Sequence, residues 1–246
     1  MPIAGGLPVS EGLGNGGLRV AIRGRRFRLD DGDSLHVVDK LDFSLSRHSF
    51  TCIVGPSGCG KTTTLRMILG LDRDYEGEIS LPGDGPVAAV FQEPRLLPWR
   101  TVEQNVRLVL PDSRRGESID ELLQELGLTE LRSFYPNQLS LGLARRAALA
   151  RAFVLQPRLL VLDEPFVSLD DATAQRLRGL LMRLWRLRPA TTLMVTHNVE
   201  EAAMLADRVL LFSDRPARIV KSIDIDTPRD QRQGEFLAGL IAQLQP

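Results

Sequence analysis

The glycine-rich segment at residues 55–63, GPSGCGKTT, constrains the fold more than any other part of the chain. It fits the pattern G-x-x-x-x-G-K-[ST], follows an apolar run at 50–54 and precedes a helical pattern at 61–69. This order predicts a phosphate-binding loop, because glycines let successive backbone N–H groups turn inward at the positive end of a helix. We expect Lys61 to reach the β- and γ-phosphates of a nucleoside triphosphate, and the Thr62 hydroxyl to ligate Mg²⁺.

The lysine of this loop is notable because arginine is otherwise the usual cation of the chain. Of 31 basic residues only three are lysines, namely Lys40, Lys61 and Lys221. A compact ammonium on a flexible stem suits the crowded end of a phosphate site better than a planar guanidinium. The lysine at position 61 therefore favours a phosphate site over a chance glycine-rich turn.

Composition and charge narrow the class of protein. The chain has 246 residues, enough to bury a full core as one domain or as a domain with a lobe. Its formal net charge is zero, which argues against nucleic acid as the main partner. No apolar run approaches the roughly 18–20 residues that span a bilayer. The glycine-rich start, residues 1–17, is expected to be a flexible tail rather than a signal peptide.

The two cysteines, Cys52 and Cys59, are too few for a disulfide scaffold and fit a reduced, cytosolic setting. Cys59 lies within the phosphate loop and next to a helix N-terminus. This setting predicts a lowered thiol pKa and inactivation by alkylating reagents.

Strand and helix patterns alternate along the chain. Strands are expected at 18–22, 41–45, 49–54, 76–81, 87–91, 159–163, 192–196, 208–212 and 217–223. Helices are expected at 61–69, 101–109, 118–126, 140–155, 171–187, 198–206 and 230–244. The order predicts an α/β P-loop NTPase at 18–246, with a largely parallel sheet core and an antiparallel β part. A helical subdomain is expected to be inserted at about 93–157, where no convincing strand pattern occurs.

A pair of acids supplies the second half of the expected site. The apolar run at 159–162 is typical of a buried parallel strand and ends in Asp163-Glu164-Pro165. Ligand sites in open α/β sheets lie at the carboxyl ends of strands, so both acids should face Lys61. Asp163 would hold Mg²⁺ through water, and Glu164 would polarise the water that attacks the γ-phosphate. A solvated turn is the alternative for such a pair, and the nearby phosphate loop favours the site.

With these motifs in this order, the chain resembles the ATP-binding subunit of ABC transporters over nearly all of residues 18–225. The resemblance implies that Gln92, in VFQEP, contacts Mg²⁺ and the attacking water. It also implies that Ser168-Leu169-Asp170 is the D-loop, and that Phe27 stacks on adenine, although an isolated aromatic is usually a core residue. His197 matches the switch histidine, and its place after an apolar strand independently predicts a position beside Glu164.

The resemblance also implies a full set of nucleotide contacts. Those expected from the phosphate loop are Gly55, Pro56, Ser57, Gly58, Cys59, Gly60, Lys61, Thr62 and Thr63. Asp170 is expected to join them, as are Ser140 and Gly142 of the signature segment 139–143, which would touch the γ-phosphate held by a partner subunit. The implied cofactors are ATP and Mg²⁺.

One residue departs from the family pattern. The signature is usually L-S-G-G-Q or a close variant, and here its first glycine is Leu141. Glycine permits close backbone approach and positive φ, which a bulky residue tolerates poorly. An altered but working signature is our interpretation, and a weakly hydrolysing or regulatory subunit is the alternative.

The sequence at 91–106, FQEPRLLPWRTVEQNV, is similar to importers of the nitrate, sulfonate and taurine group. The resemblance therefore implies an ATPase that powers transport of a small solute through a separate membrane permease. Its other partners would be a second copy of the chain and a solute-binding protein. The chain would act at the cytoplasmic face of the inner membrane, with the loop carrying Trp99 near the permease.

Two other classes were weighed against this interpretation. ABC-type ATPases of DNA repair usually carry a long coiled coil or a zinc module. Here only 46 residues separate Gln92 from Leu139, without heptads, CxxC pairs or a basic stripe. A P-loop kinase for a small molecule would leave the signature-like segment, Asp170 and His197 unexplained.

Overall fold

The computed structural model of the protein describes residues 17–30 and 32–244. The tail expected at 1–17 lies outside these residues except for Gly17. Among the helices of the described part of the chain, none is long and apolar enough to cross a membrane.

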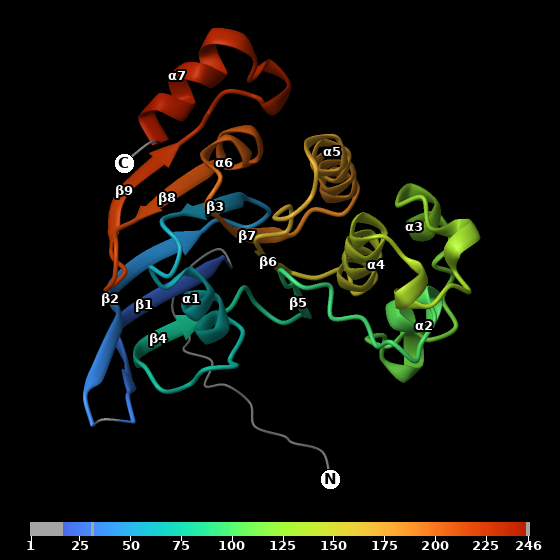
Figure 1. Cartoon of the computed structure of the whole chain (residues 1–246), viewed down its shortest axis with the longest axis horizontal. Helices are drawn as coiled ribbons and strands as arrows, with labels where there is room; N and C mark the ends of the chain where they lie inside the picture. The colour runs from blue at the N-terminus through green and yellow to red at the C-terminus, as the bar shows by residue number, and fades with distance from the viewer. Residues whose placement is uncertain (1–16, 31, 245–246) are drawn as a thin grey trace.

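A six-stranded sheet forms the centre of the molecule (Figure 1), with the strand order β5-β6-β7-β3-β8-β9. Its strands are β3 (Phe50–Val54), β5 (Val87–Val90), β6 (Leu159–Asp163), β7 (Thr191–Thr196), β8 (Arg208–Phe212) and β9 (Ile219–Asp224). All neighbours are parallel except β9, which runs antiparallel to β8. The carboxyl ends of β3, β6 and β7 therefore meet at one edge of the sheet, where ligand sites of α/β folds lie.

Both faces of this sheet are covered. Every residue of β3, β6 and β7 is buried, as expected for parallel strands packed on two sides. Because side chains alternate along a strand, Phe50, Cys52 and Val54 join one apolar cluster and Ile53 joins the other. The helices that contribute to the first cluster are α2 (Val102–Arg107), α3 (Asp120–Glu125), α4 (Leu141–Phe153), α5 (Asp171–Leu187), α6 (Val199–Leu205) and α7 (Gly234–Leu244). The second cluster is formed with α1 (Lys61–Ile68) and a smaller sheet.

The smaller sheet has three antiparallel strands in the order β2-β1-β4. They are β1 (Leu18–Arg28), β2 (Ser34–Leu45) and β4 (Glu76–Ser80). Its register shifts near the end of β1, where Arg25 pairs with Val38 and Arg26 pairs with His36. Val37 is therefore the extra residue of a β-bulge, a feature that re-aims side chains beside binding sites.

The chain between β5 and β6 is helical. It contains α2 (Val102–Arg107), α3 (Asp120–Glu125) and α4, and no strand occurs among the described residues 91–158. Figure 1 shows α2 and α3 at one side of the molecule, far from α7 and from the β1–β2 hairpin.

The predicted fold class is confirmed, and most elements lie where the patterns place them. The helix at 171–187 has the expected bounds, and its stripe of leucines, Leu177, Leu180, Leu181 and Leu184, is buried. Three elements differ from the prediction. Strand β1 ends at Arg28 instead of residue 22. Strand β2 begins at Ser34 instead of residue 41, because pairing with β1 extends it through partly exposed residues. Helix α7 begins at Gly234, since residues 229–231 form a separate 3₁₀ turn.

Candidate functional site

In the loop between β3 and α1, main-chain carbonyl oxygens bind the side chain of Lys61. Gly58 and Gly60 have φ values of 76° and 121°, a region that favours glycine. Lys61 is only 4% exposed, and its Nζ donates to the carbonyl oxygens of Gly55 and Pro56 at 2.7 and 2.9 Å. A buried cation held by main-chain oxygens can exchange them for the oxygens of an anionic ligand.

Two carboxylates lie beside this loop at the carboxyl end of β6. Thr62 Oγ1 donates to Asp163 Oδ1 at 3.3 Å, and Glu164 Oε1 lies 4.0 Å from Lys61 Nζ. Burial raises the pKa of Asp163, and the hydrogen bond from Thr62 opposes that shift. A hydroxyl and a carboxylate at this distance fit Mg²⁺, which takes its other ligands from water and phosphate oxygens. Consistent with such an open site, the described residues contain no cluster of three or more His, Cys, Asp or Glu side chains for a metal.

Glu164 is held in an unusual backbone conformation. Its φ is 45°, which for a non-glycine residue costs on the order of 1–3 kcal/mol. The Glu164 N–H donates to the Val195 carbonyl oxygen at 3.0 Å, which ties it to the adjacent strand β7. Glu164 Oε2 lies 3.1 Å from His197 Nδ1, just past the end of that strand. The fold thus brings together an acid and a histidine that are 33 residues apart in sequence.

A cavity of about 490 Å³ lies over the loop and Glu164. Nine of the predicted site residues line it, namely Phe27, Ser57, Gly58, Gly60, Lys61, Thr62, Thr63, Gln92 and Glu164. Phosphate-binding groups therefore lie at one end of this space and an aromatic ring is also part of its wall.

The comparison with known families decides the assignment. The family model described as "ABC transporter" matches residues 38–167. The chain belongs to the ABC transporter family. Membership in this family makes the chain an ATP-binding P-loop protein and an ATPase, and it confirms the resemblance found in the sequence motifs.

Similar proteins support the same family. An aliphatic sulfonates import ATP-binding protein of Streptomyces avermitilis is 43% identical over 215 residues, covering 86% of this chain and 82% of the relative. An uncharacterized ABC transporter ATP-binding protein of Methanocaldococcus jannaschii is 39% identical over 220 residues, covering 84% and 82%. The dimeric ABC transporter cassette MJ0796 matches the fold with a TM-score of 0.73 at 24% identity, covering 85% of this chain and 99% of that one.

Six of the predicted nucleotide contacts of this ABC ATPase do not line the cavity. Gly55, Pro56 and Cys59 belong to the phosphate loop itself, whereas Ser140, Gly142 and Asp170 belong to other segments. Ser140 caps α4, since its Oγ accepts from the Leu143 N–H at 3.3 Å. Gly142 faces α5 so closely that a Cβ there would lie 2.8 Å from Thr173 Cγ2. Asp170 caps α5 by accepting from the Thr173 N–H at 2.9 Å. Within one chain these residues are structural caps and packing positions.

Cavity residues that sequence motifs did not reveal come from distant strands. Leu35 and Val37 belong to β2, and Arg215 follows β8. The Arg215 Nε and Nη2 atoms donate to the Gly58 carbonyl oxygen at 3.1 and 2.6 Å. Arg215 therefore places a second cation, a guanidinium, on the phosphate loop in addition to the ammonium of Lys61, from 157 residues away in sequence.

A buried arginine connects the two halves of the site. Arg145 of α4 is 3% exposed, and it donates to the carbonyl oxygens of Pro165 at 2.7 Å and Gln92 at 3.3 Å. The segments that follow β5 and β6 are thus fastened to the same helix. The sequence placed Arg145 after the signature segment but gave no sign of this contact.

The predicted lowering of the Cys59 thiol pKa was wrong. Its thiol is 2% exposed, and burial raises the pKa although the nearby charge of Lys61 lowers it. Desolvation therefore outweighs the helix end and the cation, because the charged thiolate is the disfavoured form in a buried place. Alkylation of Cys59 is expected to be slow.

Proposed function

We propose that this chain is the ATP-hydrolysing subunit of an importer and drives a separate membrane permease from the cytoplasmic face of the cell membrane. The observation that carries the proposal is the pairing of Glu164 with His197 beside the phosphate loop. The names of the relatives favour an aliphatic sulfonate as the transported solute. A solute-binding protein would deliver that solute to the permease.

The chemistry we assign is phosphoryl transfer from ATP to water. Lys61 would leave the carbonyl oxygens of its loop and bind the β- and γ-phosphates, with the loop N–H groups around them. The ring of Phe27 would stack on adenine at the cavity wall. Glu164 would take a proton from the attacking water, held in position by His197 and Gln92.

The residues that would hold Mg²⁺ are Thr62, Asp163 and Gln92, of which the first two are already in contact. When bound there, the ion neutralises charge on the β- and γ-phosphates. Burial raises the pKa of Asp163, and a bound cation would oppose that shift because it favours the charged carboxylate.

The second copy of the chain would complete the site. Ser140, Gly142 and Asp170 do not line the cavity of their own chain, which is expected if they serve the nucleotide of the partner. We also assign residues 18–246 to one ATPase domain with the helical portion at about 93–157 as its insertion.

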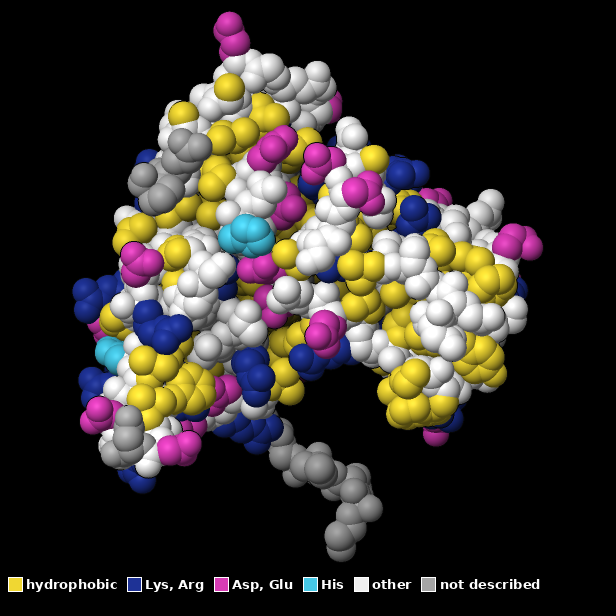
Figure 2. Space-filling view, viewed as in Figure 1, with side chains coloured by type: hydrophobic (Ala, Val, Ile, Leu, Met, Phe, Trp, Pro, Cys, Tyr) yellow, Lys and Arg dark blue, Asp and Glu magenta, His cyan; other side chains and the backbone are white. Residues whose placement is uncertain are grey.

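The permease would dock on the helical side of the molecule. Trp99 is 69% exposed, and Phe134 and Tyr135 are 37% and 44% exposed. The Val102 N–H donates to the Phe134 carbonyl oxygen at 2.9 Å, so these aromatic residues belong to adjoining segments. Hydrophobic side chains gather on the surface at the end formed by α2 and α3 (Figure 2). Exposed aromatic residues of this kind are typical of protein interfaces.

Glu164→Gln tests the proposed chemistry. The amide keeps the shape of the side chain but cannot accept a proton, so we expect steady-state ATP turnover to fall by about 100-fold or more. Binding of a fluorescent ATP analogue should stay within about threefold of the wild type, because the phosphate loop is intact. Turnover near the wild-type rate would show that Glu164 is not the base.

A further inference from the structure

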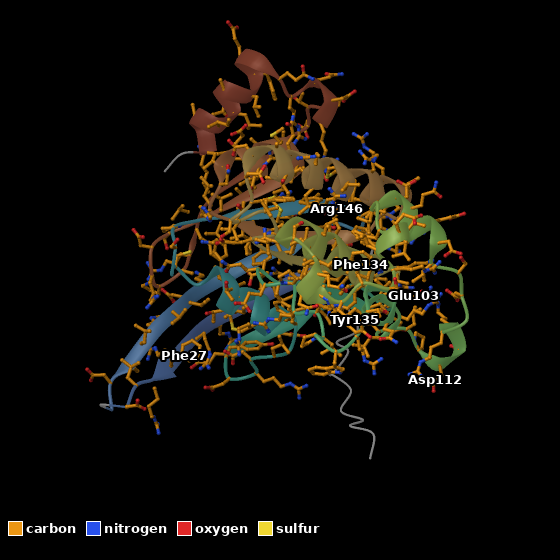
Figure 3. The ribbon with its side chains drawn as sticks, turned by 45° about the vertical axis from the view of Figure 1, so that its right-hand side comes forward. Phe27, Glu103, Asp112, Phe134, Tyr135 and Arg146 are labelled. Atoms are coloured by element: carbon orange, nitrogen blue, oxygen red, sulfur yellow. The ribbon has the colours of Figure 1, made fainter. Side chains whose placement is uncertain are left out.

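The cavity aromatic Phe27 has a cation on one face of its ring. Arg25 Cζ lies 3.9 Å from the centroid of the Phe27 ring. Arg25 is only 7% exposed, whereas the next residue, Arg26, is exposed. Phe27 is partly exposed and lines the cavity, so the face opposite Arg25 is the one left for a ligand. In Figure 3 Phe27 lies on the β1–β2 part of the molecule, far from Phe134 and Tyr135.

The guanidinium is fixed in this place by two acids. Arg25 Nε donates to Asp72 Oδ2 at 2.9 Å, and Arg25 Nη1 donates to Asp74 Oδ2 at 2.7 Å. The side chain of Asp72 is 9% exposed and that of Asp74 is 89% exposed, so the ion pair of Arg25 with Asp72 is the buried one. The guanidinium cannot easily leave the ring, because the buried carboxylate of Asp72 would then lose its partner.

Both acids follow the helix that carries the phosphate loop. The N–H groups of Leu71 and Asp72 donate to the Arg66 carbonyl oxygen at 2.9 and 3.1 Å, which anchors this segment to the end of α1. The other end of the same helix begins at Lys61. Arg25 therefore links the aromatic ring to the element that positions the phosphate-binding lysine.

We propose that Arg25 is a positioning residue for the purine base of the bound nucleotide. The inference rests on the proposed function, in which ATP occupies the cavity with its base on Phe27. Arg25 holds the ring in one orientation relative to the phosphate loop. Its positive charge also draws electron density toward the covered face, which strengthens stacking of an electron-rich purine on the other face.

The alternative is a purely structural role, in which Arg25 only holds β1 against the segment after α1. A structural role would affect the whole site, including the phosphate loop, through α1. A positioning role for the base affects only ligands that have a base. Inorganic tripolyphosphate, which offers the phosphates without the nucleoside, separates the two roles when used as an inhibitor competitive with ATP.

The experiment is Arg25→Met in the full chain, with kcat, the KM for ATP and the Ki of tripolyphosphate measured. Methionine keeps an unbranched apolar chain near the ring and removes the positive charge and the planar guanidinium group. We expect the KM for ATP to rise about fivefold to tenfold, within the usual range of a cation–π contact. We expect kcat and the Ki of tripolyphosphate to stay within about twofold. Arg26→Met, the same change at the exposed neighbour, should alter none of the three.

Arg25→Lys covers the case in which Arg25→Met does not fold. Lysine retains a charge for the acids but not a planar group over the ring, so the KM for ATP should rise about twofold to threefold with the Ki unchanged. The inference is overturned if the KM stays at the wild-type value, or if KM and Ki rise together. Phe27→Ala separates the two hypotheses: an unchanged KM there refutes stacking on Phe27, whereas a raised KM there with none in the Arg25 variants refutes only the role of Arg25.

Discussion

Leu141 occupies a position where the related signature has glycine, and the backbone there has ordinary geometry. Ser140 has φ −64° and ψ 160°, and Leu141 is the first residue of α4, so the leucine adopts ordinary helical geometry. Its side chain is 41% exposed and does not crowd the helix start. The backbone therefore carries no strain of the left-handed kind that would demand glycine.

Leu141→Gly is expected to change ATP turnover by less than about tenfold, the equivalent of ~1.4 kcal/mol. The glycine removes no buried contact and loosens the first turn of α4 by about 0.5–1 kcal/mol. Steady-state phosphate release from the purified chain provides the measurement. A gain of about a hundredfold would mean that the natural site is impaired, and would favour the regulatory alternative.

The residues that could be predicted from sequence are those whose role is set by near neighbours. Lys61 and Thr62 follow from the spacing within one loop, and Asp163 follows from the end of one apolar strand. Arg215 and Arg145 were not predicted as site residues, because only the pairing of distant elements brings them to Gly58 and Gln92. The error at Cys59 has the same origin, since its burial depends on tertiary packing.

Among the elements, α2 fixes the loop that exposes Trp99. Asn105 of α2 is fully buried, and its Oδ1 accepts from the Leu97 N–H at 2.7 Å. Its Nδ2 donates to the carbonyl oxygens of Leu97, Arg100 and Thr101 at 3.2, 2.9 and 3.0 Å. One amide thus satisfies much of the backbone of a loop that lacks regular structure of its own.

Asn105→Ala should destabilise this loop, because it leaves buried backbone groups without partners. The expected loss is about 1–3 kcal/mol, or a fall in Tm of roughly 2–4 °C for each kcal/mol in a chain of this size. Stimulation of ATP turnover by the permease should fall as well, while basal turnover persists. Gln124→Ala, an exposed amide on α3, is the control for both readouts. An Asn105→Ala protein with wild-type Tm and full stimulation would contradict the role given to this side chain.

The bounds of helices and strands, like the site residues, were predicted where the local sequence determines them and missed where distant contacts do. The helix at 171–187 was predicted to the residue, because its apolar stripe is a local signal. The early part of β2 was missed, because its exposed and partly exposed residues lack a clear alternation and gain their strand geometry from β1. Local periodicity thus predicts the bounds of elements that bury one face. The bounds of the other strands depend on pairing with their neighbours in the sheet.

At the scale of the whole molecule, the proposed dimer requires each chain to present half of a site on each of two surfaces. The phosphate loop and Glu164 line the cavity, and His197 contacts Glu164 from outside it. Ser140 and Gly142 lie at the start of α4, also outside the cavity. Ser140 is exposed and its hydroxyl oxygen bonds only within the first turn of α4 among the described contacts. A second copy that offers the same segment would close the cavity from outside, with the two surfaces exchanged.

Ser140→Arg tests this arrangement in a Glu164→Gln background, where ATP is not consumed. We expect the Glu164→Gln chain to double its mass in MgATP by size exclusion with light scattering, and the added Ser140→Arg change to abolish that shift. A large cation in place of the cap cannot fit against a closely approaching chain. ATP binding to the single chain should remain within about threefold, since position 140 lies outside the cavity. Ser133→Arg, at an exposed serine of the same helical portion, is the matched control and should dimerise normally. Dimerisation that survives Ser140→Arg would remove Ser140 from the interface, and with it the assignment of the signature segment to the partner's nucleotide.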